Sequence, residues 1–255
     1  MQWSGEGVII GVRRHGETSV IVETMTPDHG RHLGLVRGGR SRRHAATLQV
    51  GNSVQLDWRA RLSEHLGTFT IELEKARAAD LIAARNRLYA AQTVCAHLRL
   101  LPERDPNKQL YLYALEILDA DAPVCQLAQM VSLLELNLLD QLGFGLDMAS
   151  CALSGATCGL SHVSPKTGRA VTSEAAAPYL DRLLKLPPYF LKNTMASPGD
   201  VLDGLQLTGH FLHMHIWGPR QIDQPPMRDC LIVDLEQQSV GRKSGDRFFG
   251  STTRP

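Results

Sequence analysis

The segment GVIIGVRRHGETSVIVET, residues 7–24, decides how the fold begins. It joins an apolar run, Gly7–Val12, to a run rich in β-branched residues, Thr18–Thr24. Such runs favour strands, and a polar segment containing glycine between two of them is typical of a hairpin turn. The sequence therefore predicts a β-hairpin with Arg13–Glu17 at its tip.

Three more strands are predicted downstream of this hairpin. The turn signal Thr26–Gly30 leads into Arg31–Arg37, because proline presets φ and glycine tolerates positive φ. Asn52–Arg59 and Thr68–Glu74 alternate apolar and polar residues with a period of two. Five short strands within about 80 residues, with a long loop after the third, predict a small barrel of the oligonucleotide-binding type. A sandwich fragment or an SH3-like barrel also fits, since strand count does not fix topology.

After Ala78 the apolar residues recur at helical spacing. The first helix carries Leu81, Ala84, Leu88, Ala91, Cys95 and Leu98, the second Leu110, Ala114, Ile117 and Leu118, and the third Leu127, Val131, Leu134, Leu138 and Leu142. The third helix is also apolar on its other faces, which is typical of a central bundle helix and also allows a groove for a partner. A later helix should begin at Ser197, with Asp200 at capping-box spacing, and run to Ile216.

These patterns predict an α+β protein of five segments. They are a barrel over residues 1–78, a helical domain over 79–147, a cysteine-bearing hairpin insert over 148–173, the rest of the helical domain over 174–220 and a C-terminal extension over 221–255. The hairpin should turn at Ser164–Arg169. In the extension we note one short apolar run, Cys230–Val233, and expect the last dozen residues to be disordered.

Composition bounds the class of protein. The 255 residues carry a formal net charge of +1, and the opening MQWSGEGVII lacks the basic and apolar regions of a signal peptide. No apolar stretch reaches the roughly 20 residues of a membrane helix. Five widely spread cysteines are typical of a reducing compartment rather than of a disulfide framework. We therefore expect a cytoplasmic protein with no membrane partner.

Positive charge is concentrated between residues 31 and 61. This stretch holds seven arginines and one acid, Asp57, for a local charge of +6, and the arginines are Arg31, Arg37, Arg40, Arg42, Arg43, Arg59 and Arg61. Guanidinium groups match phosphate oxygens and stack on bases. The cluster fits either a solvated face or a polyanion site, and its place on the strands and loop of the predicted barrel favours a polyanion site centred on residues 37–43. Trp58 could stack on a base or fill the barrel core.

Two groups of residues resemble metal sites without completing one. Cys151, Cys158 and His162 lack the second ligand pair that structural zinc requires, since the next cysteine is Cys230. His210 and His213 share a helix face, but His215 points elsewhere and no carboxylate lies nearby. The sequence also lacks the phosphate-binding, dinucleotide-binding and hydrolase motifs. We therefore predict no metal, no cofactor and no catalytic activity.

The ordered pieces resemble the RecO family of bacterial DNA repair and recombination proteins. The matching residues are Glu6–Ile10, Gly30–His32, Val36–Gly38, Leu138–Phe144, Val163–Val171 and Leu207–Leu212. Many family members hold zinc through two CxxC pairs. Here Cys151 matches the first ligand, Ser154 replaces the second, and no cysteine lies around residues 171–174.

The resemblance implies an oligonucleotide-binding fold, a helical domain and a zinc-finger-like insert. It also implies binding of single- and double-stranded DNA, annealing of complementary strands, and loading of recombinase with RecR and single-stranded DNA-binding protein, whose acidic, apolar tail should enter a pocket in the helical domain. Two other hypotheses remain open at this point. One is a protein-interaction adaptor whose arginines meet an acidic partner, and the other is a metal-dependent enzyme using the His210 region.

Overall fold

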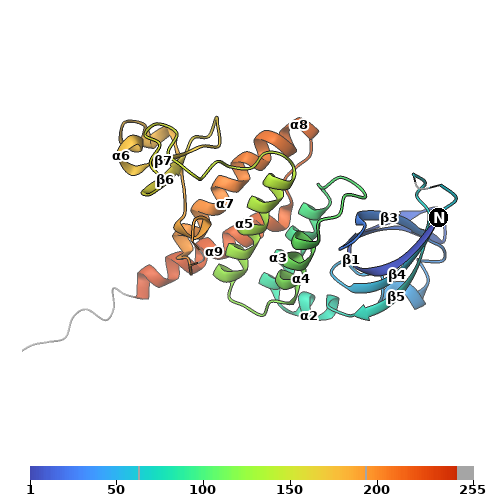
Figure 1. Ribbon diagram of the computed structural model, residues 1–255. Coiled ribbons are helices and arrows are strands. Elements are labelled where there is room, and N and C mark those ends of the chain that lie inside the picture. The colour runs from blue at the N-terminus through green and yellow to red at the C-terminus, as the bar shows by residue number, and fades with distance from the viewer. Residues whose placement is uncertain (63, 193, 246–255) are drawn as a thin grey trace, which may run out of the picture. The chain divides into compact units, whose positions relative to one another are not determined.

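The computed structural model describes residues 1–62, 64–192 and 194–245. The chain forms two compact units, Met1–Asp121 and a second that starts at Ala122, and each is described by itself. A five-stranded N-terminal sheet is followed by helices, which confirms the predicted α+β class (Figure 1).

The strands of the first unit are β1 (Gln2–His15), β2 (Ser19–Thr26), β3 (Gly30–Val36), β4 (Ser53–Arg59) and β5 (Thr68–Lys75). They close in the order β1-β2-β3-β5-β4. The long β1 strand makes this possible, because it pairs with β4 through residues 2–8 and with β2 through residues 8–15. β3 and β5 meet at one parallel pair, Leu35 with Thr68. The closed order argues against the sandwich fragment.

Alternation along the strands fills the inside of the sheet with apolar side chains. Val54, Leu56 and Trp58 of β4 point inward with Phe69 and Ile71 of β5, and all five are buried in one core cluster. The long loop after β3 holds one helical turn, α1 (Arg42–Ala45), and returns Leu48 to the same core.

Three helices complete the first unit: α2 (Ala78–Ala83), α3 (Arg85–Leu98) and α4 (Lys108–Asp119). The single helix predicted over residues 81–98 is wrong, because Ala84 adopts an extended conformation and separates α2 from α3. α3 packs against β1 and α4 against β2. Arg77 ties these parts together, donating to both carboxylate oxygens of Asp119 at 2.6 and 3.0 Å and to the Ser53 hydroxyl at 2.6 Å.

The second unit is built on three long helices. They are α5 (Val124–Gln141), α7 (Pro198–Leu212) and α9 (Pro226–Gly245), and α5 packs against the other two. A π-helical turn (His213–Trp217) and α8 (Gly218–Arg220) extend α7. The predicted capping box is confirmed, because Ser197 and Asp200 bond to each other's backbone N–H groups. Buried Leu127, Val131 and Leu138 fit the central position predicted for α5.

A small sheet lies between α5 and α7 in the sequence. Its strands are β6 (Leu160–Val163), β7 (Ala170–Thr172) and β8 (Leu184–Lys185), with β6 in the middle, and α6 (Ser173–Ala176) and two 3-10 turns (Ala177–Arg182 and Pro188–Phe190) follow β7. The hairpin predicted at Ser164–Arg169 is confirmed, since Ser164 and Arg169 are joined by a backbone hydrogen bond across the β6–β7 turn.

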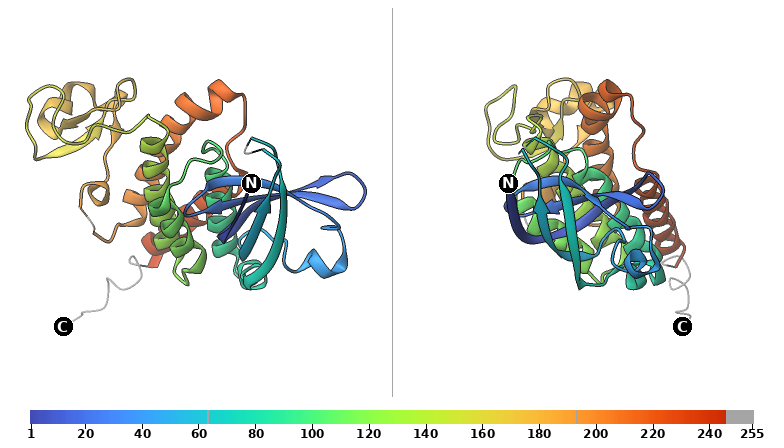
Figure 2. Two further views of the ribbon diagram at one scale, coloured as in Figure 1. Left: turned by 45° about the vertical axis from the view of Figure 1, so that its right-hand side comes forward. Right: turned by 90° about the vertical axis from the view of Figure 1, so that its right-hand side faces the viewer.

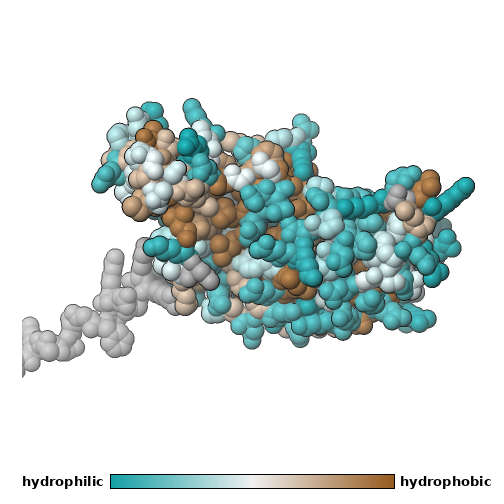
Figure 3. Space-filling view, viewed as in Figure 1, coloured by the Kyte–Doolittle hydropathy of each residue, from teal (hydrophilic) through white to brown (hydrophobic). Residues whose placement is uncertain are grey.

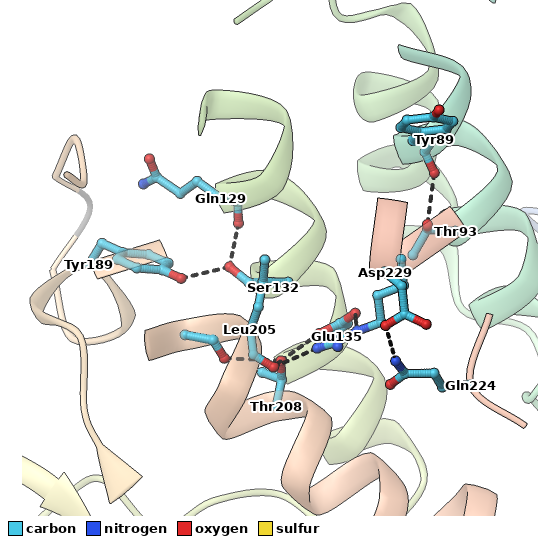
Figure 4. Close-up of polar contacts among 12 residues, drawn as sticks. Tyr89, Thr93, Gln129, Ser132, Glu135, Tyr189, Leu205, Thr208, Gln224 and Asp229 are labelled. Atoms are coloured by element: carbon cyan, nitrogen blue, oxygen red, sulfur yellow. Dashed lines mark hydrogen bonds and ion pairs between the residues drawn. The ribbon is translucent and has the colours of Figure 1, made fainter. Parts of the chain in front are cut away.

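Helix α9 lies in the predicted C-terminal extension, where the sequence pattern had predicted no helix. Its described residues are helical to Gly245, and Leu231 and Leu235 are fully buried. Arg228 reaches the buried carboxylate of Glu135 on α5 at 2.7 and 3.0 Å, and Thr208 on α7 donates to the same carboxylate (Figure 4). The expected disorder of the last dozen residues lies almost wholly outside the described residues.

Candidate nucleic-acid interface

The arginines that follow β3 gather at one end of the barrel. Arg37, Arg40, Arg42 and Arg43 are exposed on the loop and on α1. The backbone N–H of Arg40 donates to the Thr18 carbonyl at 3.1 Å, and its guanidinium donates to the Glu17 carbonyl. These bonds tie the loop to the tip of the β1–β2 hairpin.

Two arginines that the sequence prediction left out lie at the same end. Arg13 and Arg14 are exposed near the hairpin tip that Arg40 contacts. The available signal was a pair of consecutive arginines beside a turn, which the prediction assigned to the hairpin alone. We call the six residues Arg13, Arg14, Arg37, Arg40, Arg42 and Arg43 the basic rim.

A groove opens beside the basic rim where β3 and β5 diverge after their one pair. Its volume is about 500 Å³, within the range of small-ligand sites, and its lining includes Arg37, Arg43 and His44 together with Thr68, Ile71 and the acidic Glu72 of β5. We call it the seam groove. The structure thus brings Arg37 and Arg43 to one cavity.

Strand register places Arg59 on the outer face of the same region. Arg13 pairs with Ile21, Ile21 with Leu35, Leu35 with Thr68, and Thr68 with Arg59. Paired residues point to the same side of a sheet, and strands lie about 4.8 Å apart, so Arg13 and Arg59 are about 19 Å apart around the barrel. Arg61 is exposed two residues beyond.

Arg31 is placed apart from the other predicted site residues. It lies six residues before Arg37 on β3, about 20 Å away at strand spacing. Its guanidinium bonds to the Glu23 carboxylate and to the Leu101 carbonyl, the latter at 2.7 Å, and lies 3.8 Å from Glu103. With a side chain only 17% exposed, Arg31 holds the α3–α4 connection against the barrel.

Of the two roles left open for Trp58, the core role is found. Its ring is 3% exposed, and its Nε1 donates to the Leu66 carbonyl at 3.0 Å. Trp3 and His32 pack beside it, and His29 stacks on Trp3 with ring centroids 4.0 Å apart. Burial of the His32 imidazole lowers its pKa to about 4, and nearby Arg104 and His29 act in the same direction.

The remaining outer faces of the barrel are acidic or covered. Glu6, Asp57, Glu72 and Glu74 are exposed on β1, β4 and β5, and we call them the acidic strip. On β2 the outward Glu23 is buried and bonds to Arg99 at the end of α3 at 2.8 Å. Like charges repel phosphate, so a polyanion meets attractive charge at the basic rim.

In the cysteine-bearing segment, the Cys151 sulfur accepts hydrogen bonds from neighbouring residues, and no second cysteine among the described residues stands beside it as a zinc ligand. Bonds from Ser154 and Thr172 to the Cys151 sulfur lower the pKa of its thiol to about 6. Ser154 supplies a hydroxyl where the family pattern has a cysteine, so the residues do not fit zinc. His210 bonds to the Pro165 carbonyl at 3.0 Å, and His215 stacks on Phe144. Among residues 1–62, 64–192 and 194–245, no three metal-binding side chains are grouped.

The second unit carries a pocket of about 380 Å³ beside its small sheet, lined by His162, Leu180, Leu183, Leu184, Lys185 and Asp203, among others. Hydrophobic residues also gather on the face of this unit that Figure 3 shows, and Tyr179 and Leu180 before β8 are about half exposed. Within the described part of the chain, no helix is long and apolar enough to cross a membrane.

Comparison with known proteins identifies the family of this chain. Two family models match, "Recombination protein O N terminal" over residues 1–77 and "Recombination protein O C terminal" over residues 83–221. Both describe proteins of recombination, a class of DNA repair mediators rather than enzymes. The chain belongs to the RecO family of DNA repair proteins.

Individual relatives agree over nearly the whole length. The chain is 48% identical to the DNA repair protein RecO of Mesorhizobium japonicum over 251 residues, which cover 96% of this chain and 97% of the relative. It is 49% identical to the protein of that name from Brucella abortus over 245 residues, 95% and 97% of the two chains. For Methylocella silvestris the identity is 48% over 241 residues, 93% and 97% of the two chains.

Proposed function

We propose that the protein binds single- and double-stranded DNA at the end of an oligonucleotide-binding barrel that carries the basic rim, with single strands held by the arginines that follow β3. It anneals complementary strands and, with RecR, loads recombinase on strands coated by single-stranded DNA-binding protein. Membership of the RecO family supports this role in DNA recombination and repair. The observation that carries the DNA site is the separation of charge on the barrel, with the basic rim at one end and the acidic strip beside it.

The strand order supports the oligonucleotide-binding assignment. A five-stranded barrel in which β1 pairs with β2 and β4, and β3 meets β5 in parallel, matches that architecture. The segments predicted from the sequence (1–78, 79–147, 148–173, 174–220 and 221–255) are retained as proposed domains. Arg37 and Arg43 at the seam groove are the proposed centre, with Arg40, Arg42, Arg59 and Arg61 around them. For Arg31 we now favour the structural role.

The test is a fluorescence titration of a labelled single strand over a salt series, with wild type and an Arg37→Ala/Arg43→Ala variant. Two lost phosphate contacts should flatten the slope of log K against log salt by about 1.4 and weaken binding at 0.1 M salt about 25-fold. The control variant, Arg182→Ala/Lys192→Ala, removes two exposed charges from the second unit. We expect it to bind as wild type does.

Two outcomes of this titration would contradict the proposal. If wild-type protein fails to bind DNA at low salt, the adaptor hypothesis replaces this proposal. An unchanged slope in the Arg37→Ala/Arg43→Ala variant moves the DNA site away from the seam groove.

For the partners, we propose that the acidic, apolar tail of single-stranded DNA-binding protein enters the pocket beside β8. Leu180 and Leu183 offer apolar walls there, and Lys185 offers a cation, shared with Asp203 at 3.2 Å, while Asp181 adds a second carboxylate to the lining. Strand annealing measured with the cognate single-stranded DNA-binding protein, intact or lacking its tail, tests this step. Equal annealing with both forms would refute it.

A further inference from the structure

The tip of the β1–β2 hairpin projects from the end of the barrel (Figure 2). β1 leaves β4 after Val8, passes an irregularity between Ile9 and Gly11, and stays paired with β2 as far as His15 and Ser19. All residues from Val12 to Thr18 are exposed. The tip is held in place by the two bonds from Arg40 to the carbonyls of Glu17 and Thr18.

Arg13 and Arg14 lie on opposite faces of this tip. Successive side chains in a regular strand point to opposite sides, and both residues are within the paired register. Arg13 pairs with Ile21 on the outer face, in the row that ends at Arg59. Arg14 pairs with Val20, whose side chain belongs to the core on the inner face. The tip therefore presents positive charge on both faces.

Charge on two faces suits a ligand with two backbones. A single strand following the outer face of the barrel passes Arg13, but its one backbone does not also reach the inner face. A duplex carries a phosphate backbone on each side of a groove, and the major groove, about 12 Å wide, admits a two-stranded β-ribbon. Glu17 is the one acidic residue between positions 12 and 18, so the tip keeps a net positive charge.

We propose that the β1–β2 hairpin tip binds duplex DNA by holding both backbones, with Arg13 on one and Arg14 on the other. The inference rests on the proposed DNA-binding function and adds the substrate of this element. Arg13 serves both kinds of DNA, because it shares the outer face with Arg59. Arg14 serves the duplex alone. For a protein that anneals strands, the tip would hold the product.

The two neighbouring arginines provide their own matched control. Full-length Arg13→Ala and Arg14→Ala variants are titrated with a labelled single strand and with the corresponding duplex across a salt series. Arg14→Ala should weaken duplex binding about eightfold at 0.1 M salt and flatten the duplex slope by about 0.9, with single-strand binding unchanged. Arg13→Ala should weaken both, about fivefold for the single strand.

Two results would overturn the inference. If Arg14→Ala weakens single-strand and duplex binding equally, the tip is part of a general basic surface. If duplex binding is unchanged, Arg14 touches no phosphate. Both results presuppose that wild type binds DNA, so failure of the proposed function is seen separately, as a wild-type protein that binds neither oligonucleotide. Thermal unfolding by circular dichroism verifies that each variant is folded.

Discussion

The buried ion pair between Glu135 and Arg228 is expected to anchor α9, and its removal gives a large, measurable effect. The Arg228 side chain is 4% exposed and that of Glu135 fully buried. Arg228→Met would leave the carboxylate in the interior with the Thr208 hydroxyl as its remaining partner among the bonds described for it. Breaking one side of a buried pair costs about 3–5 kcal/mol of unfolding free energy.

The double variant Glu135→Leu/Arg228→Met is the matched control. Replacing both charged groups with apolar side chains is often nearly neutral, because no charge is left without a partner. Thr208 would keep a bond of 3.0 Å to the Gly204 carbonyl. We therefore expect the double variant to be at least about 2 kcal/mol more stable than the single variant.

Urea unfolding followed by circular dichroism measures both free energies, and hydrogen exchange of the α9 amides tells whether the loss is local to that helix. Because the chain has two compact units, the two transitions are fitted separately. A single variant within about 1 kcal/mol of wild type would refute the anchoring role. A double variant as unstable as the single one would show that packing volume, not charge, sets the cost.

Two further predictions concern the first unit. His32 takes up a proton near pH 6.5 in the unfolded chain but only near pH 4 in the folded protein, because burial lowers its pKa. The free energy of unfolding should therefore be highest above pH 6.5 and fall by about 3 kcal/mol as the pH is lowered to 4. Urea unfolding over this pH range should show that the free energy of unfolding of His32→Phe depends less on pH than that of wild type. An equally steep dependence would show that His32 is not the group responsible. Gly30→Ala should cost at least twice as much stability as Gly16→Ala by the same method. Both glycines have φ near +60°, but a Cβ at Gly30 would lie 2.1 Å from the Asp105 carbonyl oxygen, whereas Gly16 is open. Equal losses of unfolding free energy in the two variants would show that the loop containing Asp105 moves to make room for the added methyl group.

The strands and most helices followed from periodicity, because one face of each meets a core. Helix α9 was missed for a physical reason. Its two fully buried aliphatic residues are Leu231 and Leu235, and a third inward position is filled by Arg228, which reads as polar. A buried cation is compatible with a core only when a partner such as Glu135 is present, and that residue lies 93 positions away. The break at Ala84 also had no signal, since neither glycine nor proline occurs there.

The candidate site was predictable in composition but not in arrangement. Seven arginines between residues 31 and 61 marked a candidate region, yet sequence proximity does not say at which end of a strand a side chain lies. Arg31 and Arg37 are separated by the length of β3, and Arg31 meets Glu23 and Glu103 instead. Arg13, by contrast, joins the region through the β1–β2–β3 register, which only the folded sheet supplies.

Under the proposed function, the separation of charge on the barrel would influence how the protein encounters DNA. With a formal net charge of +1, the protein has little attraction for a polyanion at distances beyond the Debye length of about 8–10 Å. Within that length the basic rim attracts phosphate while the acidic strip on β1, β4 and β5 repels it. If DNA binds as proposed, an approaching backbone is turned toward the hairpin tip and toward Arg37 and Arg43 in the seam groove, away from Glu72 in the same groove. Because this field is local, salt should act mainly on the release of counterions at the few contacts made, so the salt slope counts the arginines engaged.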